Sequence, residues 1–246
     1  MRLVRNRSVK ILAVAGFAIS AAVQAEDFRV QLQLAYDNIS IDNSSEDADI
    51  FSGTGTFYFK PVPTDGVPVG EAAYIARSSY VDVQATQVSV GDNDADAYAA
   101  NVGYHFTNNM FFIRAGFVET NDVGDDDTTF TGTLGIVPIP RLFFGTDFTD
   151  DDWDPNLTAR YANKLANDNW WAGSISLVDT DDDTDIGLEF DYYFPKFKLG
   201  GGYNSGGDRV LVRGEMGLPN GFALLGRVYT DDLGDGFGLT LTWRDL

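Results

Sequence analysis

The sequence contains no cysteine and a single histidine, His105, among its 246 residues. Without cysteine the chain has no disulfide bond, no thiolate metal site and no thiol nucleophile. Basic residues are also scarce, because 17 lysines and arginines face 37 aspartates and glutamates, which gives a net charge of −20. Such a chain does not attract nucleic acid or an anionic membrane surface. We therefore expect no nucleic acid among its partners, and a fold that closes without covalent crosslinks.

Long apolar runs are absent as well, except near the start of the chain. Residues 1–10 carry four basic residues and no acidic one, and an almost wholly apolar stretch over 11–23 leads to Ala25. This is the pattern of a secretory signal peptide, since the stretch is too short and wrongly flanked for a membrane-spanning helix. A retained N-terminal anchor is the alternative. We expect residues 1–25 to be cleaved, which leaves 26–246 with 13 basic and 37 acidic residues and a net charge of −24.

Beyond residue 26 the dominant pattern is alternation with a period of two. In FRVQLQLAY, for example, apolar residues from Phe28 to Tyr36 alternate with Arg29, Gln31 and Gln33. Segments of about ten alternating residues between turn residues are typical of transmembrane barrel strands. The pattern predicts an all-β, antiparallel, up-and-down transmembrane barrel over 26–246 with about fourteen strands, or alternatively twelve or sixteen.

The predicted strands are 27–38, 49–60, 72–90, 95–106, 110–121, 127–137, 141–149, 155–164, 169–179, 185–194, 197–204, 207–218, 222–231 and 236–246. The third is overlong and its phase slips near residues 77–79, which indicates a bulge or a miscounted pair of strands. The connections alternate between an acidic class, such as DTDDDT, and a compact class rich in Pro, Asn and Gly, such as PNG. A barrel with two chemically different rims explains this segregation. None of the predicted connections is long enough to block the barrel fully.

The signal peptide, the alternating strands, the short turns and the final GFGLTLTWRDL resemble the bacterial outer-membrane β-barrel porins, close to the small porins of Gram-negative bacteria. The likeness covers essentially all of 26–246, although no short motif identifies a particular transporter. One departure is that Trp243 is followed by three more residues, whereas such barrels usually end on an aromatic residue. The resemblance implies a location in the bacterial outer membrane. It also implies contact with outer-membrane lipid and lipopolysaccharide, and dependence on the periplasmic export and barrel-assembly machinery.

Charged residues at inward positions predict a wet interior, because a charge at the lipid midplane costs about 2–4 kcal/mol. The predicted pore-lining residues are Arg114, Arg160, Glu189, Asp191, Arg213, Glu215 and Arg227. Basic residues outnumber the clearest acidic ones at inward positions, so we expect a positive wall below a negative mouth. A barrel of about eight strands is filled by side chains and one of about sixteen is open. Fourteen strands with small inward residues predict a monomeric channel for passive diffusion of small hydrophilic solutes and ions.

The alternative is a non-conducting structural, adhesive or surface-lipid-binding barrel whose acidic loops are the functional part. Those loops are either a solvated cap or a site for loosely bound Ca²⁺ or Mg²⁺, since such ions prefer carboxylate ligands. The candidate metal ligands are Asp92, Asp94, Asp96, Asp181 and Asp183. The stretch from Asp92 does not follow the EF-hand pattern, and no other cofactor is expected. We do not expect an enzyme, because the lone His105 comes without a nucleophile motif.

The hairpin around LPNG provides a test of register. A tight turn centred on Asn220 places Arg213 directly opposite Arg227, and such a like-charge pair is destabilising. Either Glu215 and water compensate the two arginines, or they form a basic patch with Arg114 and Arg160 that sets ion preference. The sequence leaves both possibilities open.

We expect the purified outer-membrane protein to begin at Glu26 and to migrate differently on gels before and after boiling. A closed barrel resists unfolding by detergent until it is heated, so the unboiled form should stay compact. N-terminal sequencing and electrophoresis check both points. Recovery of a soluble cytoplasmic protein that starts at Met1 would contradict this expectation.

Overall fold

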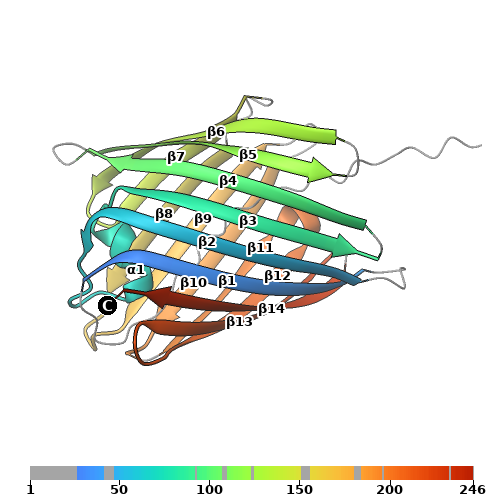
Figure 1. The fold of residues 1–246 in the computed structure, drawn as a ribbon. Helices are drawn as coiled ribbons and strands as arrows, with labels where there is room; N and C mark the ends of the chain where they lie inside the picture. Colours follow the sequence, from blue (N-terminus) through green and yellow to red (C-terminus); the bar gives the residue numbers. More distant parts are fainter. Residues whose placement is uncertain are drawn as a thin grey trace, which may run out of the picture.

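The structure is a computed structural model that describes residues 27–41, 47–91, 93–106, 110–122, 125–150, 156–179, 184–195, 197–232 and 234–245. Within these residues fourteen antiparallel strands form one sheet that closes into a barrel when β1 pairs with β14 (Figure 1). The predicted all-β barrel and its strand number are confirmed. The predicted signal peptide lies outside the described residues.

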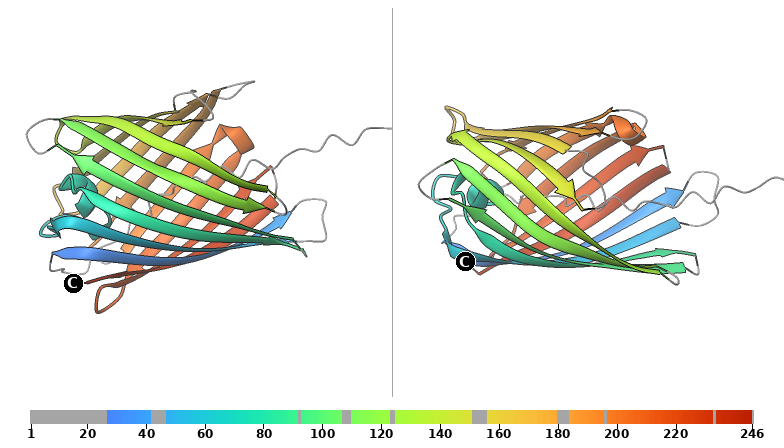
Figure 2. Two further views of the ribbon diagram at one scale, coloured as in Figure 1. Left: turned by 45° about the horizontal axis from the view of Figure 1, so that its top comes forward. Right: turned by 90° about the horizontal axis from the view of Figure 1, so that it is seen from above.

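The strands are longer than predicted at several ends and lie tilted across the barrel axis (Figure 2). Their bounds are β1 Phe28–Ile41, β2 Asp47–Val62, β3 Tyr80–Val90, β4 Asn93–His105, β5 Phe111–Asp122, β6 Asp125–Ile139, β7 Leu142–Thr149, β8 Asn156–Lys164, β9 Trp170–Asp179, β10 Thr184–Tyr193, β11 Phe197–Asn204, β12 Arg209–Gly217, β13 Phe222–Asp231 and β14 Gly234–Arg244. A short 3-10 helix, Ser205–Gly207, connects β11 to β12.

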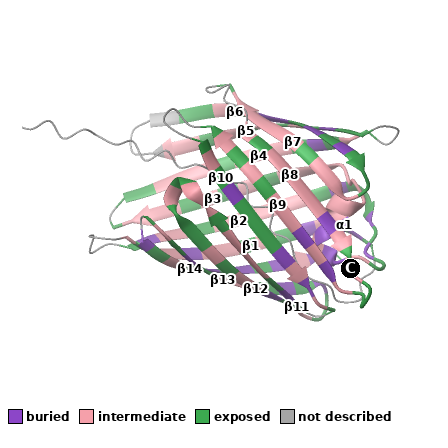
Figure 3. Ribbon diagram, turned by 180° about the vertical axis from the view of Figure 1, so that it is seen from behind, coloured by how far each residue is buried: buried purple, intermediate pink, exposed green. Residues whose placement is uncertain are grey.

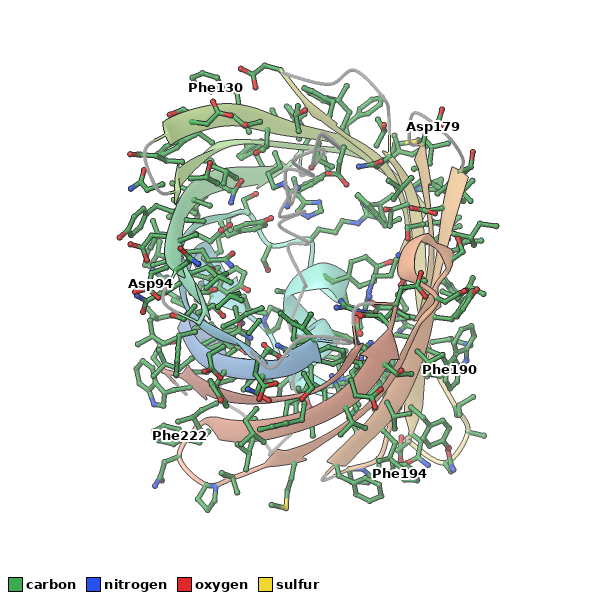
Figure 4. All side chains as sticks on the ribbon, turned by 90° about the vertical axis from the view of Figure 1, so that its right-hand side faces the viewer. Asp94, Phe130, Asp179, Phe190, Phe194 and Phe222 are labelled. Atoms are coloured by element: carbon green, nitrogen blue, oxygen red, sulfur yellow. The ribbon has the colours of Figure 1, made fainter. Side chains whose placement is uncertain are left out.

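The outer surface of the barrel is apolar. Side chains such as Leu34, Val83 and Phe190 are half to two-thirds exposed, at 65%, 57% and 51%. Figure 4 shows the labelled Phe130, Phe190 and Phe222 on the outside of the ring of strands. Their neighbours along each strand face inward, as the alternation predicted. An exposed apolar belt on a closed sheet is suited to lipid, because every strand already has two hydrogen-bonded neighbours.

The predicted third strand, 72–90, is wrong in its first half. The structure has a helix there, α1 Val69–Ile75, and β3 begins only at Tyr80. Arg77 has a positive φ of 52°, which ends the helix in the left-handed conformation often found just after a helical C-terminus. The phase slip near residues 77–79 was therefore the end of a helix and not a bulge. Among the described residues, no helix is long and apolar enough to cross a bilayer.

The connection between β2 and β3, residues 63–79, is also longer than any connection that the sequence predicted. It carries α1 into the barrel at the end where the C-terminus lies (Figures 1 and 2). We call this the turn end, and the opposite end, between β1 and β2, the acidic end. Buried residues concentrate around α1 (Figure 3). The expectation that no connection could block the barrel is therefore corrected.

Phe28 was predicted on the outer face but lies inside, where it is 1% exposed. The register between β1 and β2 shifts between Phe28 and Val30, so the start of β1 is out of phase with the rest of the strand. The inward Phe28 packs edge-on against Tyr58 at a ring distance of 5.5 Å. This irregularity provides part of the apolar surface on which α1 rests.

The predicted register of the LPNG hairpin is confirmed. Asn220 and Gly221 have positive φ angles of 59° and 78°, as expected of a tight Asn-Gly turn. Val212 pairs with Val228 on the outer face, and Arg213 pairs with Arg227 on the inner face. The turn therefore fixes the register between β12 and β13.

We expect Val83→Arg to lower the free energy of unfolding from a lipid bilayer by about 2–4 kcal/mol, because the charge would enter the apolar belt. The matched control is Gln84→Arg on the same strand, whose side chain faces the interior and can remain in water. Urea unfolding of both variants in lipid vesicles measures the difference. Equal effects of the two substitutions would contradict the assignment of the lipid and lumen faces.

Candidate pore and its charged lining

Helix α1 spans the barrel interior from one side of the wall to the other. On one side Val69 and Ala72 pack with Phe28, Tyr58 and Val62 of β1 and β2. On the other side Val67, Tyr74 and Ile75 pack against a buried cluster on β8, β9 and β10, formed by Ala162, Trp170, Ala172 and Tyr193. These two groups of strands lie on opposite sides of the closed strand order. The 63–79 connection therefore narrows the lumen at the turn end.

A buried carboxylate fixes α1 to the far wall. Glu71 is fully buried, and its Oε1 accepts hydrogen bonds from Nη2 of Arg160 on β8 and from the hydroxyl of Tyr193 on β10, both at 2.5 Å. Its Oε2 has no partner within the described part of the chain. Removal of one partner from a buried ion pair is strongly destabilising, because it leaves the other charge without compensation. Glu71 is thus the polar anchor of the helix.

Tyr74 provides a second contact between α1 and the wall. Its hydroxyl lies 2.6 Å from the carbonyl oxygen of Arg141 and 3.0 Å from that of Arg160, and donates to these acceptors. The Arg160 guanidinium lies over the Tyr74 ring, 5.6 Å from its centre. Burial raises the pKa of Tyr74 well above its usual value, so the hydroxyl remains protonated and can act as the donor. A longer contact joins Arg77 Nη2 to the Val137 carbonyl oxygen at 3.4 Å.

The seven predicted lining residues all lie on strands and all form ion pairs. Arg114 pairs with Asp147, Arg160 with Glu71, Arg213 with Glu189 and Asp191, Arg227 with Asp37, and Glu215 with Lys198. None of these pairs was predicted, although Arg213, Glu189 and Asp191 were each named as lining residues. Their role in lining a conducting path remains a prediction.

Two expectations about this lining are wrong. The wall does not carry a positive surplus among the described residues, because Asp37, Asp147 and Glu71 also face the interior and neutralise arginines. Glu215 does not compensate Arg227, because its carboxylate lies 3.1 Å from Lys198 Nζ and both side chains are 1% exposed. Arginines on neighbouring strands are thus held by separate acids.

The lining retains contact with water despite this pairing. The Glu189 side chain is 47% exposed, that of Asp147 is 39% exposed and that of Arg227 is 29% exposed. Asp191, in contrast, was expected to be exposed but is buried at 3% behind Arg213. The inner wall is therefore accessible to solvent at these three side chains. Figure 4 looks into the barrel from the acidic end and shows α1 within the ring of strands.

The candidate metal ligands are not gathered into a site. Asp92, Asp181 and Asp183 lie outside the described residues, and Asp94 points away from the barrel near the acidic end (Figure 4). Asp96 is on the same strand, β4. Across the described ranges no three acidic, histidine or cysteine side chains are arranged to hold a metal ion. Binding of Ca²⁺ or Mg²⁺ at the loops remains a prediction.

Sequence reasoning missed four residues that the site depends on: Glu71, Asp147, Tyr193 and Asp37. Asp37 and Asp147 occupy inward positions of their strands, so a stricter count of the alternation would have included them. Glu71 is the only acidic residue in the apolar stretch VPVGEAAYI, and this isolation was the available signal. Tyr193 has no such signal, because one aromatic residue among the many strand aromatics is not distinctive.

Comparison with solved structures shows the barrel fold. The outer membrane protein Omp33 of Acinetobacter baumannii is 16% identical, with a TM-score of 0.74 over 89% of this chain and 98% of that chain. OprB of Pseudomonas putida is 9% identical with a TM-score of 0.47, over 89% of this chain and 92% of that chain. No protein-family model matches the chain, and no curated protein is significantly similar. The chain therefore shares the fold of Omp33, and its function has to be argued from its own residues.

We expect Glu71→Gln to release α1 from the wall at a cost of about 3–5 kcal/mol, because Arg160 would be left buried without its counter-charge. Faster hydrogen exchange of the Ala76 amide, which donates to the Ala72 carbonyl at 2.8 Å, measures this release. The control is Asp168→Asn, which removes an exposed ion pair with Lys164 and should leave exchange unchanged. Unaltered exchange in Glu71→Gln would mean that apolar packing alone holds the helix.

Proposed function

We propose that the protein is an outer-membrane channel for passive diffusion of small hydrophilic solutes and ions, narrowed at one end by α1. The observation that carries this proposal is the water exposure of inward charged side chains, with Glu189 at 47% and Arg227 at 29%. A dry interior would bury them. A closed barrel with an apolar exterior and a wet, charged interior is an aqueous path through a membrane.

The orientation follows from the two ends of the barrel. The first residue of β1 and the last residue of β14 both lie at the turn end. In bacterial barrels of even strand number the short turns face the periplasm. The acidic end then faces the outside of the cell, and α1 lies at the periplasmic end. Outer-membrane lipid, including lipopolysaccharide, surrounds the apolar belt. The export and barrel-assembly machinery that inserts such barrels is the corresponding partner during biogenesis.

The charge distribution favours cations over anions. The chain has a net charge of −20, and four arginines of the lumen, Arg114, Arg160, Arg213 and Arg227, are paired with neighbouring acids. A negative entrance raises the local concentration of cations. The solutes that fit best are therefore small, polar and neutral or positively charged.

A non-conducting barrel is the second candidate, and one observation favours it. Helix α1 contacts both sides of the wall, so the path at the periplasmic end is narrow. A channel of low conductance would also have such a narrow path. Conductance measured before and after removal of α1 therefore distinguishes the channel from the non-conducting barrel.

We expect the wild-type protein in a planar bilayer to give small conductance steps. A variant with residues 66–77 replaced by a short Gly-Ser linker should give larger ones, because the space occupied by α1 becomes water. Heat-modifiable mobility on gels confirms that each barrel is folded before recording. Silence from both folded proteins would reject the channel and favour the structural barrel.

A further inference from the structure

A row of six paired residues crosses the inner wall from β10 to β1. In order along the row they are Asp191, Gly200, Arg213, Arg227, Gly238 and Asp37, each at the register position opposite the next. From either end the sequence of residues is Asp, Gly, Arg. The row therefore consists of two equivalent halves that meet between β12 and β13 and include the β1–β14 closure.

In each half the arginine reaches across the glycine of the middle strand to the aspartate beyond it. Arg213 Nε and Nη2 donate to the two carboxylate oxygens of Asp191 at 2.9 Å and 2.8 Å. Arg227 makes the same two-pronged contact with Asp37, with Nε at 2.7 Å from Oδ1. The two arginines therefore point away from one another, which relieves the repulsion expected from their opposed positions.

The glycines leave the space in which these ion pairs lie. A Cβ atom on Gly200 would overlap the Asp191 carboxylate, and one on Gly238 would overlap the Asp37 carboxylate and lie 2.6 Å from Arg227 Nε. Any other residue at these positions would have to displace the ion pair. Glycine is thus required because two charged groups pass directly over the backbone of the middle strand.

We propose that Gly200 and Gly238 determine the ion preference and free width of the channel, by letting both ion pairs lie flat on the lumen wall. This inference rests on the proposed channel function. Flat pairs cancel their charges at short range and leave the centre of the lumen free. When a pair is separated, the long arginine side chain extends toward the axis, while the short aspartate stays at the wall. The lumen then becomes narrower and locally more positive.

Gly238 is the better position for a test. At Gly200 an added Cβ would also lie 2.8 Å from the Phe190 carbonyl oxygen, so the backbone would have to move. At Gly238 the nearest atoms belong to the ends of the Asp37 and Arg227 side chains, which can move without the backbone. The matched control is Gly226 on β13, where an added Cβ would meet only Leu239 Cδ2 at 3.8 Å.

The experiment compares Gly238→Ala, Gly226→Ala and Asp37→Asn with the wild type in planar bilayers under a KCl gradient. We expect Gly238→Ala to lower single-channel conductance and to shift the reversal potential toward anions. Asp37→Asn should shift the reversal potential in the same direction, because it also frees Arg227. Gly226→Ala should match the wild type. The double variant Gly238→Ala with Asp37→Asn should shift the potential no further than either single variant if both act through Arg227.

A folded Gly238→Ala barrel with the conductance and reversal potential of the control would overturn the inference and leave the channel function standing. A Gly238→Ala variant that loses thermal stability but keeps wild-type permeation would mean that the row only stabilises the closed barrel. This outcome would also overturn the inference. If Gly238→Ala does not fold, an unchanged reversal potential in Asp37→Asn decides against the inference. Folded wild-type protein that never conducts, even without α1, would reject the channel and this inference together.

Discussion

A strand surrounded by lipid finds no water for its backbone N–H and C=O groups, so each strand needs a hydrogen-bonded neighbour on both sides. In this chain the last two free edges belong to β1 and β14, which pair from Gln31 with Arg244 to Ile41 with Gly234. Beyond the ladder, the Asp245 carboxylate accepts from the backbone amides of Arg29 and Val30 at 2.8 Å and 2.7 Å. Closure separates an outer surface for lipid from an interior that can hold charge.

That interior explains why the charged residues occur in pairs. Charges removed from bulk water are costly unless opposite charges and hydrogen bonds compensate them. The strands bring acids and bases of neighbouring or next-neighbouring strands within reach, as with Arg114 and Asp147 at 3.1 Å. The charges of the lining are therefore arranged in local ion pairs and do not form a wall of one uniform sign.

Helix α1 depends on the same closure. A helix of this length is not stable by itself, because nucleation costs more than so few hydrogen bonds return. It forms here because Val69 and Ala72 find apolar partners on one wall while Glu71 and Tyr74 find polar partners on the other. The barrel supplies both walls. In return, the helix occupies part of the lumen at the turn end.

The sequence by itself determined the features that arise from neighbouring residues. Alternation with a period of two specified the strands and their lipid and lumen faces, and the Asn220–Gly221 turn specified the register that places Arg213 opposite Arg227. Only the tertiary structure decided which charges meet. Arg227 and Asp37 are brought together by the closure of β1 on β14, and Glu71 reaches Arg160 by crossing the lumen. No local pattern encodes these contacts, because they depend on strand number and register around the whole barrel. The helix was missed for the same reason, since its stability comes from both walls.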